Sequence, residues 1–544
     1  MGIPSYFSYI IKNHSNIIRN WHFHQNINHT VFNSLYMDCN SIIYDAVRQV
    51  DAGADIEESI ISAVISKIKE HIAMIRPTNV LYIAFDGVAP LAKMEQQHIR
   101  RYKTGYIAAI DFANTETPIN SNTDSSKWNT AAITPGTKFM ELLSAKMEYA
   151  FSQQFFGVKK IVVSAANIPG EGEHKMFQYM RDHANQKETI AVYGLDSDLI
   201  MLSLLHCFAC DNIYIFREAP EFSKSMLPKD MKVRPNESLF LNHRKLADCI
   251  LKEMGCFSGS KSGEESDRGR IYDYIFLCFF LGNDFLPHFP AFNLRTNGIY
   301  TLLDMYKAHI GKYDDRRFIG LDTGNIQWKW VKLFIGELAK VEHANLLEEY
   351  EIREKLEKRR FPEKTAEERE LMFDNIPVLY RQEEHYICPQ ERGWESRYYN
   401  IAIPDTDVKE VCINYLEGLE WVFKYYTEGC PHWRWKYRFH YPPLMKDLVN
   451  YVPDFETPFI DSTEGINRPF HPNVQLSYVI PSWNHHLLPS EARRVLEKHP
   501  DLLVGVSEVR FQWMFCRYFW ESHAKLREIP LEKLNEWDKG YIDG

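Results

Sequence analysis

Five short runs rich in β-branched and aromatic residues, separated by longer amphipathic stretches, constrain the fold of this 544-residue chain most strongly. Alternation of this kind indicates repeated strand–helix units and a mostly parallel sheet. We therefore predict an α/β fold with a mostly parallel central sheet flanked by helices. The predicted strands span residues 31–37, 79–85, 160–165, 189–195 and 212–216, and the predicted helices lie near residues 55–75, 90–104, 136–155, 172–185 and 270–282.

Acidic residues follow four of these predicted strands. The carboxyl ends of parallel strands share one edge of a sheet, where ligands usually bind, so acids that are distant in sequence can converge there. A further acid follows the apolar run at 274–282 and can join them. The full set is Asp38, Asp86, Glu171, Glu173, Asp196, Asp198 and Asp284.

These carboxylates would repel one another strongly in one crevice unless a counter-charge is present. Hard divalent cations supply that charge, and Mg²⁺ in particular takes oxygen ligands while keeping water molecules for chemistry. The set lacks the histidine and cysteine ligands of a zinc site. A single residue such as Asp86 is explained equally well as a loop aspartate. The whole set instead favours two metal ions arranged for phosphodiester hydrolysis. His174 is either a partner that supports the metal ligands or, as we favour, a surface histidine on a helix.

A basic stripe follows Asp86. If residues 91–104 are helical, positions i, i+4, i+7 and i+8 share one face, and they are occupied by Lys93, Gln97, Arg100 and Arg101. Three cations and an amide on one face can make charge-assisted hydrogen bonds to a phosphate. The alternative is a solvated basic face, which usually explains a run of charges. The neighbouring acids favour a phosphate-binding role over a solvated face.

Composition and charge limit the cellular compartments and the partners that we expect. No apolar run approaches the roughly 18 residues that cross a bilayer, and the amino terminus carries no secretion or myristoylation signal, so we expect an intracellular protein without a membrane contact. The sequence does not separate the cytoplasm, slightly favoured, from the nucleus. The ten cysteines are scattered, which suits a reducing compartment. The net charge of −10 argues against nucleic acid as a partner only if the acidic residues are evenly distributed over the surface.

Segment composition predicts three parts. The first spans residues 1–305 and has exposed polar loops near 112–132 and 258–270. Residues 306–400 are expected to form a connector of charged surface helices. Residues 401–544 are rich in aromatic residues and punctuated by proline, which predicts a second, mostly helical region packed against the first. This region is expected to complete the active-site pocket.

Several motifs resemble, in order and spacing, those of the XRN-type 5′-to-3′ exoribonucleases. In the first conserved region the matching segments include MGIPSYF, YMDCNSIIY, FDGVAPLAKMEQQHIRRYKT, IPGEGEHKM, YGLDSDLIML and LGNDFLPHFP. Segments HWRWKYRFHYPPL (432–444) and RPFHPNVQLSYVIP (468–481) resemble the second conserved region. The resemblance covers most of residues 1–300 and roughly 400–525.

The resemblance implies a PIN-like core related to flap nucleases that hydrolyses single-stranded RNA with a 5′ monophosphate. Degradation would be processive, would release nucleoside monophosphates and would serve RNA and mRNA decay. It implies that the seven acids bind two Mg²⁺ ions, for which Mn²⁺ can substitute. The basic stripe corresponds to a 5′-phosphate pocket too tight for a cap or a triphosphate. Decapping or RNA-processing proteins are possible partners, and we expect a monomer.

Aromatic residues of the family also have counterparts in this chain. Pro90 takes the place of a residue that helps to exclude duplex. Family members stack the first bases between an aromatic residue, here Trp433 or Trp435, and a histidine, whose position Tyr44 occupies. Stacking would then be aromatic on aromatic. The chain also stops near the second region and so resembles a compact member without the long carboxy-terminal extension.

Two other functions compete with the exoribonuclease. A flap-type DNA nuclease would share the acids, but we find neither its helical arch nor its helix-hairpin-helix contact in the sequence. An inactive RNA-binding scaffold would have no physical reason to keep so costly a cluster of carboxylates.

Overall fold

The computed structural model describes residues 2–22, 26–50, 55–114, 128–152, 156–194, 196–210, 212–219, 227, 231, 233, 234, 237–256, 263–463 and 465–543. The side chains of residues 110–114 and 543 fall outside this description. So do Leu195, at the end of a predicted strand, residues 115–127, which make up most of the first predicted loop, and residues 257–262, which include the start of the second.

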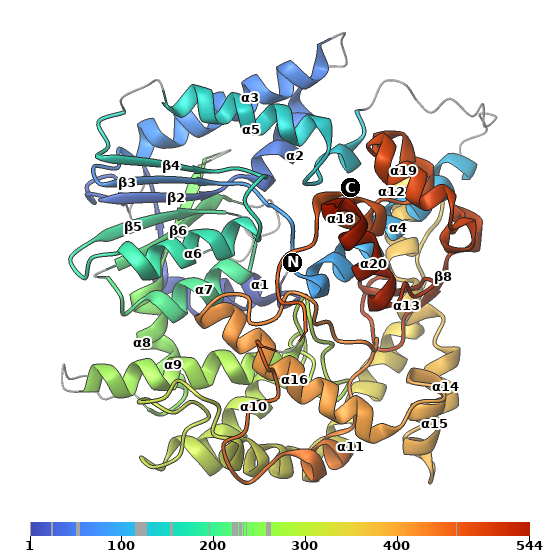
Figure 1. Ribbon diagram of the computed structural model, residues 1–544. Helices are drawn as coiled ribbons and strands as arrows, with labels where there is room; N and C mark the ends of the chain where they lie inside the picture. Colours follow the sequence, from blue (N-terminus) through green and yellow to red (C-terminus); the bar gives the residue numbers. More distant parts are fainter. Residues whose placement is uncertain are drawn as a thin grey trace.

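A seven-stranded sheet forms the centre of the amino-terminal half (Figure 1). The strand order is β1-β7-β6-β5-β2-β3-β4, and all neighbours from β6 to β4 are parallel. β7 pairs antiparallel with β6 and with β1. The strands are β1 (Ile18–Asn20), β2 (Ser34–Asp38), β3 (Val80–Ala84), β4 (Lys160–Ser164), β5 (Thr189–Tyr193), β6 (Asn212–Glu218) and β7 (Ser238–Asn242). The predicted mostly parallel sheet is therefore confirmed, and the sequence analysis misses only β1 and β7.

Helices cover both faces of this sheet (Figure 1). Leu35 and Met37 of β2 join the core beneath one set of helices, whereas Tyr36 joins the core on the opposite face, as the alternation of a strand requires. The first set is α2 (Asn40–Gln49), α3 (Ile56–Ile75) and α5 (Lys138–Ser152). The second set is α6 (Gly172–His183), α7 (Asp198–His206), α8 (His243–Glu253) and α9 (Glu264–Cys278).

The carboxy-terminal half is mostly helical and packs against the second set. One hydrophobic core runs from Ile3 to Phe515, and α16 (Val408–Thr427) contacts α7. The other helices are α1 (Tyr6–Asn13), α4 (Leu91–Asn114), α10 (Gly298–Tyr306), α11 (Trp328–Glu357), α12 (Ala366–Asp374), α13 (Ile376–Leu379), α14 (Gln382–Ile387), α15 (Trp394–Ala402), α17 (Met445–Leu448), α18 (Pro472–Val479), α19 (Ser490–Glu497) and α20 (Leu531–Asp543), and β8 (Arg510–Gln512) pairs with β9 (His523–Lys525).

Two predicted exposed segments differ from the structure. The predicted loop at 258–270 is wrong for residues 264–270, because α9 begins at Glu264, where acidic residues suit a helix amino terminus. Arg270 is buried there and donates to the Tyr306 hydroxyl (2.8 Å). In the predicted connector, α12 has no buried residue, whereas α11 buries an apolar stripe and belongs to the main core. The division into three parts stays a prediction.

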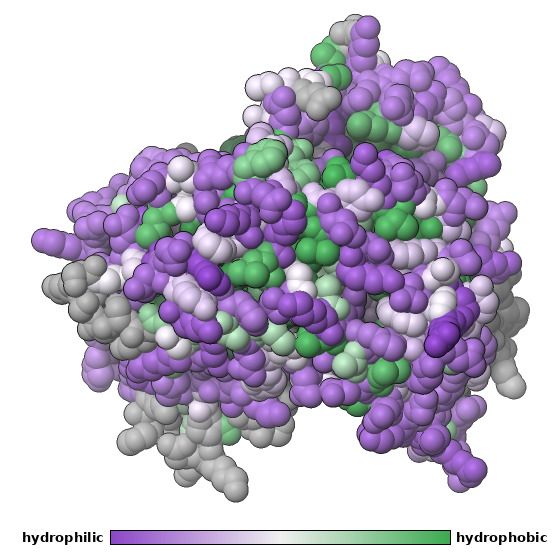
Figure 2. Space-filling model, turned by 90° about the horizontal axis from the view of Figure 1, so that it is seen from below, coloured by the Kyte–Doolittle hydropathy of each residue, from purple (hydrophilic) through white to green (hydrophobic). Residues whose placement is uncertain are grey.

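The surface seen from below is mostly hydrophilic, with several small hydrophobic groups near its centre (Figure 2). Among the described residues, no helix combines the length and the apolar character that crossing a bilayer would require.

Candidate active site

The predicted acids meet at the carboxyl edge of the parallel strands. Asp38 ends β2, and Asp86 lies two residues after β3. Glu171 and Glu173 lie at the start of α6, beyond β4, and Asp196 and Asp198 lie between β5 and the first turn of α7. Asp284 comes from the turn that follows α9. Of the seven, all except Asp198 line one cavity of about 970 Å³.

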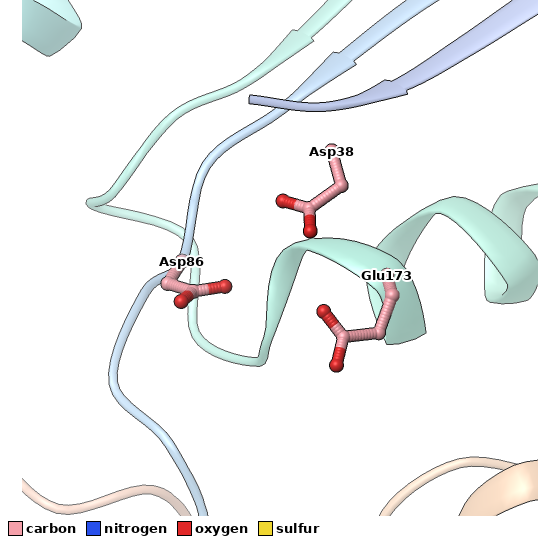
Figure 3. Close-up of side chains that lie close together, drawn as sticks. All are labelled: Asp38, Asp86 and Glu173. Atoms are coloured by element: carbon pink, nitrogen blue, oxygen red, sulfur yellow. The ribbon is translucent and has the colours of Figure 1, made fainter. Parts of the chain in front are cut away.

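Three of these acids form a group that can hold a metal ion. Asp38, Asp86 and Glu173 each offer a carboxylate oxygen, and these oxygens lie within 4.8 Å of one another. Figure 3 shows the three side chains, from a strand end, a loop and a helix, directed toward a common space. Such oxygen ligands suit a hard divalent cation.

The first turn of α6 packs directly on this group. The Gly172 N–H donates to Asp86 Oδ1 (2.7 Å), so the positive end of the helix dipole faces a carboxylate. A Cβ at position 172 would lie only 2.8 Å from Asp38 Oδ1, which explains the glycine. The side-chain amide of Asn40 also holds Asp86. Its Nδ2 donates to Asp86 Oδ2, and its Oδ1 accepts from the Asp86 backbone N–H.

Among the described residues, no cation lies within ion-pair distance of this first group, and Lys93 and Lys175 act on it from farther away. Burial, followed by the neighbouring Asp86 carboxylate, raises the pKa of Asp38 to about 8. Burial, followed by Glu171 and Asp38, raises the pKa of Glu173 well above its usual value. Closely spaced carboxylates with raised pKa values store repulsion that a bound cation would relieve.

A second group of acids surrounds Lys93 of α4. The ammonium of Lys93 lies 2.6 Å from Glu171 Oε2 and 2.9 Å from Asp284 Oδ2. Burial alone would raise the pKa of Asp284, but the Lys93 ammonium and further positive charges, Arg100 among them, together hold that pKa below its usual range. Lys93 therefore supplies a counter-charge at ion-pair distance in this half of the site, whereas it acts on Asp38 and Glu173 only from farther away.

The amino-terminal segment closes the second group from another side. The Gly2 N–H donates to Asp284 Oδ1 (3.1 Å). Gly2 has a positive φ of 52°, and a Cβ there would lie 2.1 Å from Asp198 Oδ1. Burial, followed by the Asp196 and Asp284 carboxylates, raises the pKa of Asp198 to about 7.

The basic stripe of α4 faces the same cavity. Lys93, Gln97, Arg100 and Arg101 all line it, as their helical spacing predicts. Gln97 Oε1 and Arg101 Nε are buried without a hydrogen-bond partner among the described residues, and neither Arg100 nor Arg101 forms an ion pair with a described carboxylate. Burial lowers the pKa of Arg101 to about 10, which leaves the guanidinium charged at neutral pH. The stripe thus presents unmatched polar groups to the cavity.

The residues predicted to stack or to exclude duplex occupy different places. Tyr44 is half-buried and lines the cavity. Pro90 is buried just before α4, and Trp433 accepts a hydrogen bond from the Leu91 N–H (2.9 Å). Trp435 packs on another tryptophan ring with centroids 5.2 Å apart. Of these four, only Tyr44 is among the described lining residues, and the stacking roles stay predictions.

The second region contributes contacts that the sequence analysis misses. Residues 436–441 and 520–524 line the cavity beside α4, where Lys436 pairs with Glu95 (2.6 Å) and Lys103 donates to the Trp520 carbonyl (2.7 Å). The Tyr425 hydroxyl donates to Glu171 Oε1 (2.8 Å), and the Tyr426 hydroxyl donates to Asp198 Oδ1 (2.9 Å). The predicted surface position of His174 is wrong, because its ring stacks on Tyr425 with centroids 3.6 Å apart. No local signal marks these residues, since their role arises from the packing of α16.

Comparison with protein families gives two matches. The model described as "XRN 5'-3' exonuclease N-terminus" matches residues 1–219. The model described as "Xrn1 helical domain" matches residues 266–390 and 380–526. Together they cover both halves of the chain and the residues around the cavity.

Curated relatives are similar over nearly the whole chain. "5'-3' exoribonuclease 2" of Arabidopsis thaliana is 26% identical, over 93% of this chain and 62% of its own length. "5'-3' exoribonuclease 1" of Saccharomyces cerevisiae is 24% identical, over 100% of this chain and 43% of its own length. The chain thus spans less than two thirds of the length of either relative.

A solved structure of the catalytic core of Rad2 in complex with DNA substrate covers 57% of this chain and 69% of that chain. It is 16% identical, with a TM-score of 0.29, which is too low to support an argument about fold or function.

Proposed function

Because the chain belongs to the XRN 5′-3′ exonuclease family, we propose that it is a metal-dependent, processive 5′-to-3′ exoribonuclease acting on single-stranded RNA with a 5′ monophosphate. One observation carries the proposal: six of the seven acids and the basic stripe of α4 line the same cavity of about 970 Å³. That volume is at the upper end of the range for ligand pockets and can accommodate a nucleotide.

The acid cluster suits Mg²⁺, with Mn²⁺ as a substitute. Asp38, Asp86 and Glu173 would hold one ion, and Glu171, Asp196, Asp198 and Asp284 would complete the site. Two such ions supply an activated water and stabilise the leaving oxygen during phosphodiester hydrolysis. The chain's own part is to hold these carboxylates close together against their mutual repulsion.

The stripe of α4 would hold the 5′ phosphate. Arg100 and Arg101 offer charged donors that no described carboxylate neutralises, and Gln97 offers an amide beside them. Guanidinium groups bind a phosphate through paired hydrogen bonds. With the terminal phosphate held at α4, the following phosphodiester would reach the acids, and release of one nucleoside monophosphate would return the strand to the same position.

The remaining expectations stay proposals of the same kind. We expect a monomer inside the cell that acts in RNA decay, with a decapping or RNA-processing protein as a partner. Tyr44 and either Trp433 or Trp435 are the candidates for base stacking, and Pro90 for duplex exclusion. A flap-type DNA nuclease and an inactive RNA-binding scaffold remain the alternatives that the experiment below separates.

The test is a time course on one RNA sequence carrying a 5′ monophosphate, hydroxyl, triphosphate or cap, with Mg²⁺ or with EDTA. We expect mononucleotides only from the monophosphorylated RNA and only with Mg²⁺. Cleavage of a flapped DNA in place of RNA would indicate the DNA nuclease. RNA binding without cleavage at any metal concentration would indicate the scaffold.

Three variants test the roles assigned to these residues. Asp196→Ala or Asp198→Ala should abolish cleavage while RNA binding remains measurable, because metal ligation is lost. Arg101→Ala should reduce the preference for a 5′ monophosphate over a 5′ hydroxyl. An unchanged preference would remove α4 from the phosphate pocket, whereas retained turnover in the aspartate variants would refute the metal assignment.

A further inference from the structure

We propose that Tyr425 and Tyr426 of α16 are positioning residues for the metal-binding acids: their hydroxyl groups hold Glu171 and Asp198 and thereby set the affinity of the acid cluster for a divalent cation. The inference rests on the proposed function, which assigns those acids to metal binding. It adds two residues of the second region to a site built on the first.

The two hydrogen bonds are direct and buried. The Tyr425 hydroxyl lies 2.8 Å from Glu171 Oε1, and the Tyr426 hydroxyl lies 2.9 Å from Asp198 Oδ1. The two tyrosines are 2% and 1% exposed, respectively. Burial, followed by the bonded carboxylate, raises the pKa of each tyrosine well above its usual value, so both hydroxyls remain donors at neutral pH. Donors of this kind favour the ionised, ligating form of the carboxylates.

The tyrosine rings are fixed by their neighbours. Tyr425 stacks on His174, with centroids 3.6 Å apart, and packs against Trp421 at 4.7 Å and Phe285 at 5.6 Å. Tyr426 meets the edge of the His174 ring at 5.5 Å and is similarly held by Phe279 at 5.7 Å. Rings packed on several sides cannot rotate away, so each hydroxyl keeps its place relative to its acid.

The two acids stand at different depths. Glu171 lines the cavity, with Tyr425 at one oxygen and Lys93 at the other (2.6 Å). Asp198 lies behind the cavity wall, where Tyr426 and the Gly2 backbone border it. Partners that orient metal ligands from behind typically change metal affinity or activity by about 10- to 100-fold when they are removed.

This arrangement gives the second region a specific task. Tyr425 and Tyr426 lie 254 and 228 residues from the acids that they hold. The metal site is therefore completed by α16, and the carboxylates of the first region depend on the docking of the second.

The test compares Tyr425→Phe, Tyr426→Phe and the double variant with the wild type. Tyr398→Phe is the matched control, because it also removes one buried tyrosine hydroxyl bond, to the Pro442 carbonyl (2.8 Å), and touches no acid. Mn²⁺ binding to the full chain without RNA is measured by electron paramagnetic resonance. The half-saturating Mg²⁺ concentration for cleavage is measured in parallel, and circular dichroism establishes an equal folded fraction.

We expect the Mn²⁺ dissociation constant and the half-saturating Mg²⁺ concentration to rise about 10-fold in each single variant, and not in Tyr398→Phe. Values equal to those of Tyr398→Phe would overturn the inference, as would the absence of Mn²⁺ binding by the wild type. The proposed function fails separately: if the wild type binds Mn²⁺ and the tyrosine variants bind it more weakly, the inference stands even when no RNA is degraded.

Discussion

The two halves of the acid cluster obtain their counter-charge in different ways. Asp38, Asp86 and Glu173 are held by the sheet and the start of α6, and no described cation pairs with them within ion-pair distance. Glu171 and Asp284 share the ammonium of Lys93. We call the first half the open half; it is built from one region of the chain. We call the second half, around Lys93, the braced half; it is completed by α4, α16 and the amino-terminal segment.

The difference shows how a protein can keep many carboxylates together before a metal arrives. In the braced half, Lys93, Tyr425 and Tyr426 offset part of the repulsion, although burial still raises the pKa of Glu171 and, to about 7, that of Asp198. The open half keeps its repulsion, which raises the pKa of Asp38 to about 8. The free energy of cation binding is most favourable where that repulsion is unrelieved. We therefore expect the open half to bind metal first.

The largest expected effect is a loss of activity in both halves, whereas the change in melting temperature should differ between them. Asp38→Asn and Asp284→Asn should each reduce cleavage by at least about 10³-fold, because each removes an oxygen ligand that carries charge. Without metal, Asp38→Asn should melt at the same or a higher temperature, since it removes repulsion. Asp284→Asn should melt lower, since Lys93 loses a partner. Equal melting shifts in the two variants would remove the distinction between the halves.

Lys93→Met tests the braced half directly. It leaves Glu171 and Asp284 buried without their cation, and breaking a buried ion pair typically costs about 3–5 kcal/mol. Urea unfolding in EDTA measures the loss. Lys146→Met is the control, because its pair with Glu58 is exposed and should contribute about 1 kcal/mol or less. A loss no greater than that of the control would contradict the counter-charge role.

Substitution of two glycines can displace the acids of each half without removing any of them. Gly172→Ala would place a Cβ 2.8 Å from Asp38 Oδ1 in the open half, and Gly2→Ala would place one 2.1 Å from Asp198 Oδ1 in the braced half. Displacements of this size should reduce kcat by about 10²-fold. Gly540→Ala is the control, since a Cβ there meets nothing within 4 Å. Wild-type kcat in both site variants would show that the acids tolerate movement.

The smallest effect is a pH dependence of stability in the absence of metal. The pKa of Asp38 is raised to about 8 in the folded chain from about 4 when unfolded, so the folded state binds more protons between those values. Stability in EDTA should therefore fall as pH rises from about 5 to about 8. Mg²⁺ should flatten this slope, and Asp38→Asn should reduce it. A melting temperature that rises over this range in EDTA would contradict the raised pKa.

Much of the fold and of the open half could be predicted from local pattern. Each predicted strand is a short run of β-branched and aromatic residues, and parallel pairing places the acids that follow β2, β3, β4 and β5 at one edge. The helical spacing of Lys93, Gln97, Arg100 and Arg101 likewise placed the four on one face of α4, where all of them line the cavity. β1, with three residues, and β7, antiparallel and outside the strand–helix alternation, have no comparable signal.

The sequence by itself determined the parallel sheet, the convergence of the acids and the basic face of α4, because these follow from periodicities of two and about 3.6 residues. Only the tertiary structure decided which acids share Lys93, which remain without a counter-charge, and that Tyr425 and Tyr426 reach Glu171 and Asp198. The two tyrosine–acid contacts join residues more than two hundred positions apart, and their existence depends on how α16 packs against α7, which no local pattern encodes.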